Sequence, residues 1–441
     1  MPTLALITTT AVAATAGELT LENGLRVILR EDHRAPLVAL TLAVDAGAAD
    51  DPPGQAGTAH LLEHMLFEGS AAVPGQGFDL ALAAVGGDSN AWTHYDLMSF
   101  SQVLPPGALE RALFLEADRL GRPSLEPDAV ARQRAVVQAE GAREHDTPHG
   151  RDAAVLAALL YPGHPYARTL LGLWGAERDP ALTILDAGAL RTFWEGLLTP
   201  ERCALTIVGD FDTVQAVAWA HATVGAIPAR PPAPRSAALA PALAGAQRRV
   251  LWADAGDRTL YLAWRGVPRG DPDEPALALL AWLLAGREET GLRHRLTSRG
   301  RARRVEAWSD AWRLGGGFVV SVSAWRGRLA PLRRAVDREI ARLAEEGPTE
   351  AELQQARGAW RGTWLRADES VERVTPLLAQ CALTHAEADC LDAELARYEA
   401  VSADDVRRVA QGLLEAPGRV LLSVVAPGAR PLRGSTAVEM E

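Results

Sequence analysis

The stretch GTAHLLEHMLFEGS, residues 57–70, places two imidazoles and a carboxylate inside an otherwise apolar run. His60 and His64 are four residues apart, so on a helix they project from one face, one turn apart. Two neutral imidazoles at this spacing can bind one zinc ion. Glu63 directly precedes His64, from where its carboxylate can accept a proton from a water on the open side of the metal. The stretch therefore predicts a helix that carries a catalytic zinc site, and the alternative is an amphipathic helix with a polar edge.

A catalytic zinc site needs a third protein ligand, which is often a carboxylate. The segment QRAVVQAEGAREHD supplies Glu140, 76 residues after His64, at the end of an apolar-periodic helical pattern. A carboxylate is costly to bury there unless it is paired or bound to a metal, so Glu140 is the favoured third ligand. The rival ligands, whose more polar surroundings are typical of a solvated face, are Glu144, His145 and His149.

A segment rich in proline and alanine, typical of an extended linker, divides the chain into halves of similar size. Each half combines runs of β-forming residues with helical patterns, which indicates an α/β half-domain. The predicted organisation is a leader or signal segment (1–17), an N-terminal zinc-binding domain (18–225), a linker (226–247) and a metal-free C-terminal domain (248–441).

The early helical patterns of the two halves differ at the positions of the predicted zinc site. HLLEHMLF, residues 60–67, aligns with ALLAWLLA, residues 278–285, and the leucines coincide. The three positions of the predicted site are occupied in the second half by Ala278, Ala281 and Trp282. The second half therefore indicates what this helix contains when it only has to pack.

Composition excludes several classes of function. The formal net charge is −11, from 45 basic and 56 acidic residues, which argues against nucleic acid as the main partner. The three cysteines are too few for a disulfide framework and form no C-x-x-C pair, so we expect buried small hydrophobes at Cys203, Cys381 and Cys390. No segment has the uninterrupted apolar length of a membrane span. The first residues leave export to a bacterial periplasm and a cytoplasmic location equally open.

The chain resembles the pitrilysin/insulinase family of zinc peptidases, in the smaller subunit class that includes mitochondrial processing peptidase. That family carries the inverzincin order H-x-x-E-H, followed by a glutamate in a segment like ER-x-V-V-x-x-E, which here is QRAVVQAE, residues 133–140. Further matches in the first half are NGLRVIL, HLLEHMLFEGS, GGDSNAWTHYDLMSF, YPGHPYARTLLG and IVGDFD. In the second half the similarity weakens but persists in the order of the helices and in the closing strand.

The resemblance implies an α+β fold: two homologous half-domains, each an antiparallel-rich mixed sheet packed against helices, which together form half of a clamshell. It also implies that one zinc ion per chain is bound by His60, His64 and Glu140, and that Glu63 is the general base. The family often has a glutamate at the position of Gln133, which supports the site from behind the ligands. Glutamine keeps a hydrogen-bond acceptor but loses the charge, so we expect it to tune the metal affinity.

The family also suggests where a substrate peptide binds. SNAWTHYD, residues 89–96, would be an edge strand, and Asn90 and Ala91 would hold an extended peptide by main-chain pairing. Asn90 equally suits a turn after Gly86 and Gly87, so both interpretations stay open.

Family members that are active alone carry an Arg and a Tyr in their second half, which orient the substrate. The corresponding segment here, RLTSRGRARRVEA, has no tyrosine, and Thr297 or Arg303 falls at the position of the pair. The family also pairs a zinc subunit with a metal-free paralogue that supplies the Arg and Tyr. We therefore expect this chain to be the zinc subunit of such a heterodimer; a homodimer is the less favoured arrangement.

These residues predict a zinc endopeptidase that hydrolyses short or unfolded peptides in a closed chamber. The alternative within the family is a non-catalytic scaffold or core subunit, and retention of all four site positions argues against it. A metal-binding or redox protein without hydrolysis is a third class, and a glutamate beside an open coordination position argues against that one.

Overall fold

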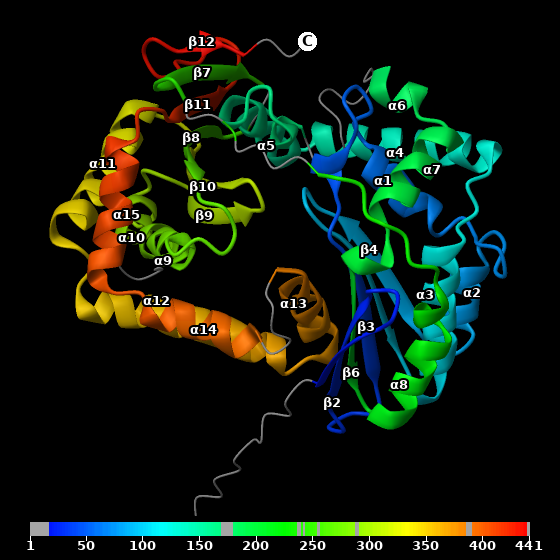
Figure 1. Cartoon of the computed structure of the whole chain (residues 1–441). Coiled ribbons are helices and arrows are strands. Elements are labelled where there is room, and N and C mark those ends of the chain that lie inside the picture. The colour runs from blue at the N-terminus through cyan, green and yellow to red at the C-terminus, as the bar shows by residue number, and fades with distance from the viewer. Residues whose placement is uncertain are drawn as a thin grey trace, which may run out of the picture.

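The computed structural model describes residues 17–168, 180–235, 240, 243–253, 256–286, 291–384 and 390–438. In this part of the chain two domains of the same architecture face one another, each with a six-stranded mixed sheet packed against helices (Figure 1). The predicted fold class is confirmed. The predicted leader lies almost entirely outside the described residues, and the proposed domain boundaries stay predictions.

The N-terminal sheet has the strand order β1-β2-β6-β3-β5-β4. Only β2 and β6 pair in parallel, so the sheet is mainly antiparallel. Asn23 and Gly24 lie in the turn between β1 and β2, and Gly24 has a φ of 90°. The strands are β1 (Gly17–Thr20), β2 (Arg26–Glu31), β3 (Val38–Val44), β4 (Asp88–Thr93), β5 (Met98–Leu104) and β6 (Cys203–Gly209).

The C-terminal sheet repeats this plan with the order β12-β7-β11-β8-β10-β9. The outermost strand β9 occupies the edge that β4 occupies in the first domain. The strands are β7 (Gln247–Trp252), β8 (Arg258–Gly266), β9 (Arg304–Trp312), β10 (Gly315–Ala324), β11 (Val420–Val425) and β12 (Thr436–Ala437).

The described helices divide between the two domains. Those of the first domain are α1 (Thr58–Met65), α2 (Gly77–Ala83), α3 (Leu109–Gly121), α4 (Pro127–Asp146), α5 (Pro148–Leu160), α6 (Pro180–Ile184), α7 (Ala187–Leu197) and α8 (Thr213–Ala222). Those of the second are α9 (Glu274–Ala285), α10 (Gly291–Thr297), α11 (Leu329–Glu346), α12 (Glu350–Asp368), α13 (Val371–Thr384), α14 (Cys390–Ala400) and α15 (Ala403–Glu415). None of the described helices has the length and apolar character that crossing a membrane requires.

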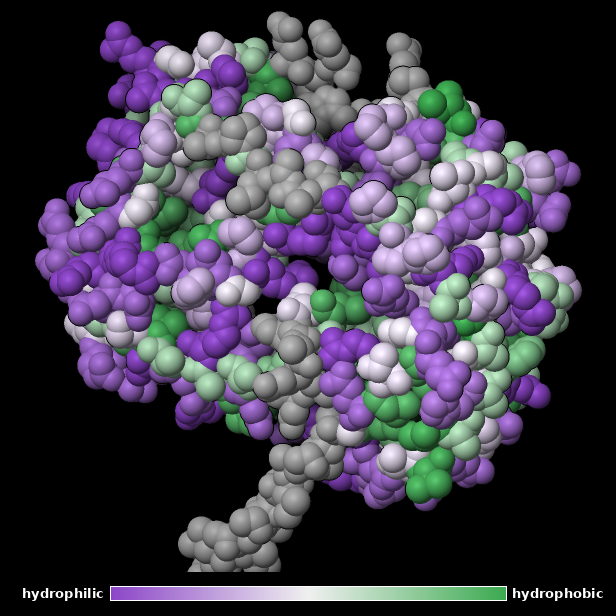
Figure 2. Space-filling view, in the orientation of Figure 1, coloured by the Kyte–Doolittle hydropathy of each residue, from purple (hydrophilic) through white to green (hydrophobic). Residues whose placement is uncertain are grey.

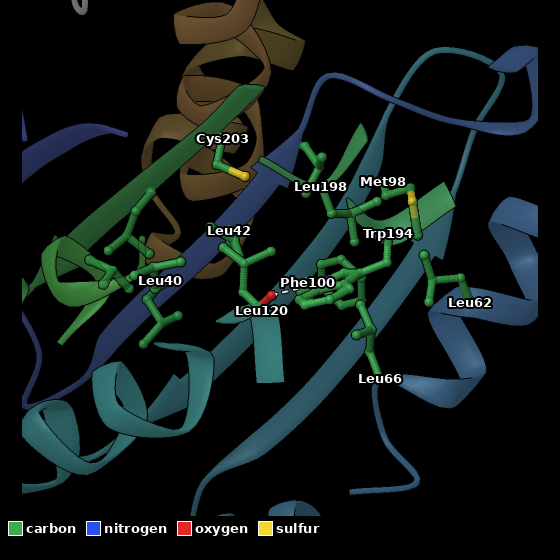
Figure 3. Close-up of a cluster of buried hydrophobic side chains, with 14 of the residues drawn as sticks. Leu40, Leu42, Leu62, Leu66, Met98, Phe100, Leu120, Trp194, Leu198 and Cys203 are labelled. Carbon is green, nitrogen blue, oxygen red and sulfur yellow. Dashed lines mark hydrogen bonds between the residues drawn. The ribbon is translucent and has the colours of Figure 1, made fainter. Parts of the chain in front are cut away.

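The core of the first domain lies between its sheet and α1, α3 and α7. Strand β3 is buried along all seven residues, as its continuous apolar run predicts for a strand covered on both faces. Phe100 of β5 lies in this core near Trp194 of α7, whose indole nitrogen donates a 2.8 Å hydrogen bond to the carbonyl of Leu120 (Figure 3). The same core buries Leu61 and Leu62 of α1, so the apolar residues of the first helix fix its orientation on the sheet.

Each domain contributes one helix that packs on the sheet of the other domain. Helix α13 of the second domain covers the other face of the N-terminal sheet, where Val374 and Leu378 pack against Val208 of β6. In return, Val155 and Leu156 of α5 belong to a cluster of buried residues that covers the β8 and β11 face of the C-terminal sheet. Figure 1 shows both helices against the sheet of the opposite domain. Each domain therefore completes the burial of its partner's sheet, which fixes their relative position.

Part of the motif YPGHPYA joins the domains at the turn between β9 and β10. The hydroxyl of Tyr166 donates to the carboxylate of Asp96 at 2.8 Å and accepts from the amide of Leu314 at 2.9 Å. The hydroxyl of Tyr161 donates to the carbonyl of Gly316 at 2.6 Å and accepts from its amide at 2.8 Å. These buried bonds hold the β9–β10 turn against the loop that follows β4.

The cysteine prediction is right about burial, since all three cysteines are buried, and wrong about pairing for two of them. Cys381, near the end of α13, and Cys390, the first residue of α14, form a disulfide, with their Cα atoms 6.0 Å apart. The helices bring together two positions that are nine residues apart, which a count of cysteines cannot reveal. Cys203 is free and buried, as expected.

Candidate active site

Helix α1 begins at a fixed place because buried groups hold its first turn. The Asp51 carboxylate accepts hydrogen bonds from the backbone amides of Gly57, at 2.6 Å, and Ala59, at 2.8 Å. Gly57 has a φ of 89°, a conformation that a side chain would strain. Just upstream, the amide of Ala48 donates to the carbonyl of His94 at 2.9 Å, which ties the loop before α1 to the end of β4. The helix is thus set against the edge strand.

His60, His64 and Glu140 come together between α1 and α4. The Glu140 Oε2 atom lies 3.3 Å from His64 Nε2 and 3.8 Å from His60 Nε2. One ligand atom from each residue falls within 4.8 Å of the others, and among the described residues this is the one group of three or more such side chains able to hold a metal. Ligand atoms bound to one zinc at about 2.0–2.2 Å lie a little over 3 Å apart, so this donor set fits a zinc ion.

The rival ligands do not join this cluster. Glu144 and His149 line the adjoining cavity, farther along the chain than Glu140, and His145 lies between them on α4. The structure therefore brings together the residues that the sequence favours and leaves the three rivals outside the cluster.

The imidazole of His60 is suited to metal binding at neutral pH. It is 8% exposed, and burial together with the neighbouring His64 ring lowers its pKa to about 4. An imidazole with such a pKa is neutral at pH 7 and keeps a nitrogen lone pair for a metal.

Glu63 lies beside this cluster with one carboxylate oxygen engaged. Its Oε2 atom accepts a 2.5 Å hydrogen bond from the hydroxyl of Thr93 on β4, and both residues line the cavity. Burial raises the pKa of Glu63, and the Thr93 hydrogen bond opposes that shift. Sequence reasoning missed Thr93, although it lies in the SNAWTHYD segment. The sequence contained a signal for Thr93, because side chains alternate between the two faces of a strand and Thr93 therefore shares a face with Ala91.

Gln133 contacts the metal-ligand cluster from behind. Its Oε1 atom lies 3.0 Å from Nδ1 of His64, on the ring side opposite the nitrogen that faces Glu140. This is the contact that a residue supporting the ligand requires.

Asn90 and Ala91 lie within the edge strand β4, and Ala91 lines the cavity. Asn90 pairs with Ser101 of β5, so the interpretation of Asn90 as a turn residue is wrong, because the turn falls at Gly86, whose φ is 75°. The outer edge of β4 has no neighbour in the described sheet. A role for either residue in substrate binding remains a proposal.

The cavity lies between the domains and has a volume of about 1610 Å³. Figure 2 shows the hollow between the two halves of the molecule. The first domain contributes α1, β4 and α5 to its wall, and the second contributes α9, β9 and α12. Ala278, Ala281 and Trp282, the counterparts of the three motif residues, therefore face the same space as His60 and Glu63.

Neither candidate for the substrate-orienting pair lines this cavity. Thr297 donates to the carbonyl of Arg293 at the end of α10, and Arg303 pairs with Asp257 at 3.1 Å. Among the described residues, the one tyrosine in the cavity wall is Tyr95, whose hydroxyl donates to the carbonyl of Arg168 at 2.8 Å. Sequence reasoning missed the two arginines that do line the wall, Arg293 and Arg366.

Comparison with known proteins agrees with this geometry. Residues 26–172 match the family model "Insulinase (Peptidase family M16)", and residues 185–359 match "Peptidase M16 inactive domain". The chain belongs to the M16 peptidase family. The model for the inactive domain includes α9, the helix without metal-type side chains, so the M16 assignment and the contrast between the two early helices agree.

Relatives and solved structures of M16 type extend over most of the chain. An uncharacterized zinc protease of Mycobacterium leprae is 27% identical over 402 residues, which is 90% of this chain and 88% of the relative. A probable mitochondrial-processing peptidase subunit beta of Arabidopsis thaliana is 25% identical over 89% of this chain and 75% of its own length. The crystal structure of a protease from Helicobacter pylori shares the fold with a TM-score of 0.86 at 20% identity, covering 93% of this chain and 99% of that one.

We predict that Asp51 makes the stability of the zinc-free chain depend on pH. Burial raises the pKa of Asp51 from 3.8 to about 7, so between these values the folded state holds a proton that the unfolded state has released. The stabilising effect of this proton is complete below about pH 4 and is lost as pH rises through 7. The side chain at position 51 cannot ionise in Asp51→Asn. The free energy of unfolding of the wild type should therefore fall by about 2–3 kcal/mol relative to that of the variant between pH 5 and pH 8.

Urea unfolding of both zinc-free proteins at the two pH values measures this difference. A difference between the two free energies of unfolding that does not change with pH would contradict the prediction.

Proposed function

We propose that this chain is a zinc-dependent endopeptidase subunit that hydrolyses short or unfolded peptides inside the cavity between its domains. The observation that carries this proposal is the position of Glu63. Its carboxylate lies on the cavity wall together with His60, on the helix that carries two of the cluster residues, with one oxygen held by Thr93. The names of the M16 relatives as zinc proteases support the same conclusion.

In this proposal His60, His64 and Glu140 hold one zinc ion. Bound there, zinc would lower the pKa of a water ligand to about 7 and polarise a peptide carbonyl. Glu63 would accept the proton of the attacking water and deliver it to the leaving amine, because it is the carboxylate of α1 that lines the cavity. Thr93 keeps that carboxylate oriented.

The substrate is proposed to bind as an extended strand on the free edge of β4, near Asn90 and Ala91. Main-chain pairing there gives affinity with little sequence preference. The cavity of about 1610 Å³ admits a peptide segment, whereas a folded domain is far larger. Hydrolysis is therefore confined to short or unfolded chains.

We further propose that a metal-free paralogue completes the site. Thr297 and Arg303 lie away from the cavity, and the Tyr95 hydroxyl is engaged with a backbone carbonyl. An Arg and Tyr pair that orients the substrate carbonyl would then come from the partner. The resemblance to a processing peptidase beta subunit supports a heterodimer.

The test measures zinc content and cleavage of an internally quenched peptide on the purified chain, with and without the candidate paralogue. We expect one zinc per chain, loss of cleavage on chelation, recovery on adding zinc, and strong stimulation by the paralogue. Full activity of the chain alone would overturn the heterodimer. A zinc-free chain that still assembles with its partner would indicate the non-catalytic scaffold instead.

A further inference from the structure

In the described part of the chain, only one of the two ligand imidazoles has its second ring nitrogen held by the protein. His64 Nδ1 lies 3.0 Å from Gln133 Oε1, whereas the buried Nδ1 of His60 has no hydrogen-bond partner among the described residues. The orientation and tautomer of His64 therefore depend on Gln133. An amide can present either its oxygen or its nitrogen to a ring nitrogen, so something else must decide which one faces His64.

Glu68 determines which atom of the Gln133 amide faces His64. The Gln133 Nε2 atom donates a 2.6 Å hydrogen bond to Oε1 of Glu68, which lies just beyond the end of α1. An ionised carboxylate can only accept hydrogen bonds, so the amide nitrogen must face Glu68 and the amide oxygen must face His64. The oxygen can only accept, so His64 must carry its hydrogen on Nδ1. Its Nε2 atom is then left with a lone pair, on the side of Glu140.

The surroundings of Glu68 hold the carboxylate in this place. Its side chain is 15% exposed, and its second oxygen accepts a hydrogen bond from Arg132 at 3.1 Å. Arg132 is 65% exposed, so solvent screens that ion pair, and the better-shielded contact is the one to Gln133. Both polar atoms of the Gln133 amide are used, and the chain of contacts runs from Arg132 through Glu68 and Gln133 to His64.

We propose that Glu68 is a positioning residue of the metal site, which sets the tautomer and orientation of His64 through Gln133. This inference rests on the proposed zinc site. It assigns to Glu68 a task that neither the sequence motif nor contact with the metal would reveal, because two hydrogen bonds separate its carboxylate from the His64 imidazole. Loss of a group behind a metal ligand typically weakens metal affinity about 10- to 100-fold.

The test compares zinc dissociation constants of full-length variants by competition with a chelator. In Glu68→Gln the new amide can face Gln133 with either its oxygen or its nitrogen. The Gln133 amide is then no longer held with its oxygen toward His64. We expect zinc affinity to fall about 10-fold or more. The matched control is Glu126→Gln, which removes a carboxylate from the start of α4 that is exposed and makes no side-chain cap; its zinc affinity should equal that of the wild type.

A paired exchange separates positioning from a general effect on folding. Glu68→Gln with Gln133→Glu moves the carboxylate next to His64, where it accepts from Nδ1 directly, and the new amide at position 68 donates to it. This double variant should bind zinc as the wild type does. If Glu68→Gln does not fold, the zinc affinity of the double variant alone tests the inference. Wild-type affinity in Glu68→Gln, or an affinity in the double variant that is lowered about 10-fold or more, overturns the inference. A wild-type chain that binds no zinc overturns the proposed function instead.

Discussion

Glu63→Gln is expected to lower the rate of peptide cleavage by about 10²- to 10⁴-fold, the usual contribution of a general base. The amide has nearly the same shape and can still accept the hydrogen bond from Thr93, but it cannot take a proton from water. Glu63 is not one of the three clustered ligand residues, so the variant should bind one zinc ion per chain. Zinc content and cleavage are measured on the same samples, with the partner present.

The matched control for this prediction is Glu144→Gln, which removes another carboxylate from the wall of the same cavity. It should cleave at the wild-type rate, because Glu144 lies outside the ligand cluster and the Thr93 hydroxyl donates to Glu63. A wild-type rate of cleavage by Glu63→Gln would contradict the assignment of Glu63 as the general base. Loss of zinc together with activity would instead mean that Glu63 supports the metal.

Glu116→Leu is expected to cost about 3–5 kcal/mol of unfolding free energy, the penalty for breaking a buried ion pair from one side. Glu116 and Arg119 of α3 have 0% and 2% of their side chains exposed, and the Arg119 Nε atom donates to Glu116 at 2.9 Å. The guanidinium also lies 4.3–4.8 Å from the ring centres of three phenylalanines. Without the carboxylate, this charge would stay buried among aromatic rings.

Removing both charges separates the cost of an unpaired charge from the value of the pair. Glu116→Leu with Arg119→Met should recover most of the lost stability, since a buried pair replaced by apolar groups is often neutral. The exposed Glu110 of the same helix provides the control, and Glu110→Leu should change stability by less than about 0.5 kcal/mol. Urea unfolding measures all four proteins; equal losses in the single and double variants would refute the argument.

Loss of the Glu116 carboxylate should also disturb the helix that carries the metal ligands. One of the three rings is Phe67, which follows the C-cap residue of α1 and packs against Phe78 at a centroid distance of 5.5 Å. The Arg119 guanidinium therefore supports the end of the helix that carries His60 and His64.

The sequence predicted the elements of this site because short-range rules govern them. The spacing of His60 and His64 requires one helix face, and α1 provides it. The apolar run at residues 278–285 predicted a helix that only has to pack, and these residues of α9 are almost all buried. The repeat of the two halves was visible because each domain builds its own sheet from consecutive local patterns. The M16 resemblance followed from the same motifs.

What the sequence could not supply were contacts between residues far apart along the chain. Thr93 reaches Glu63 because β4 lies beside α1, and Glu68 reaches His64 only through Gln133 of α4. The disulfide was missed because pairing depends on where α14 begins after α13.

The sequence by itself determined the local chemistry: two imidazoles and a carboxylate on one helical turn, a later glutamate and two homologous halves. Only the tertiary structure decided which carboxylate meets the imidazoles, which groups hold them, and that both early helices face one cavity. The physical reason is that helical spacing is fixed by bonds within a few residues. The position of α4 and the exchange of α5 and α13 depend instead on burying sheet faces formed by residues distant in sequence.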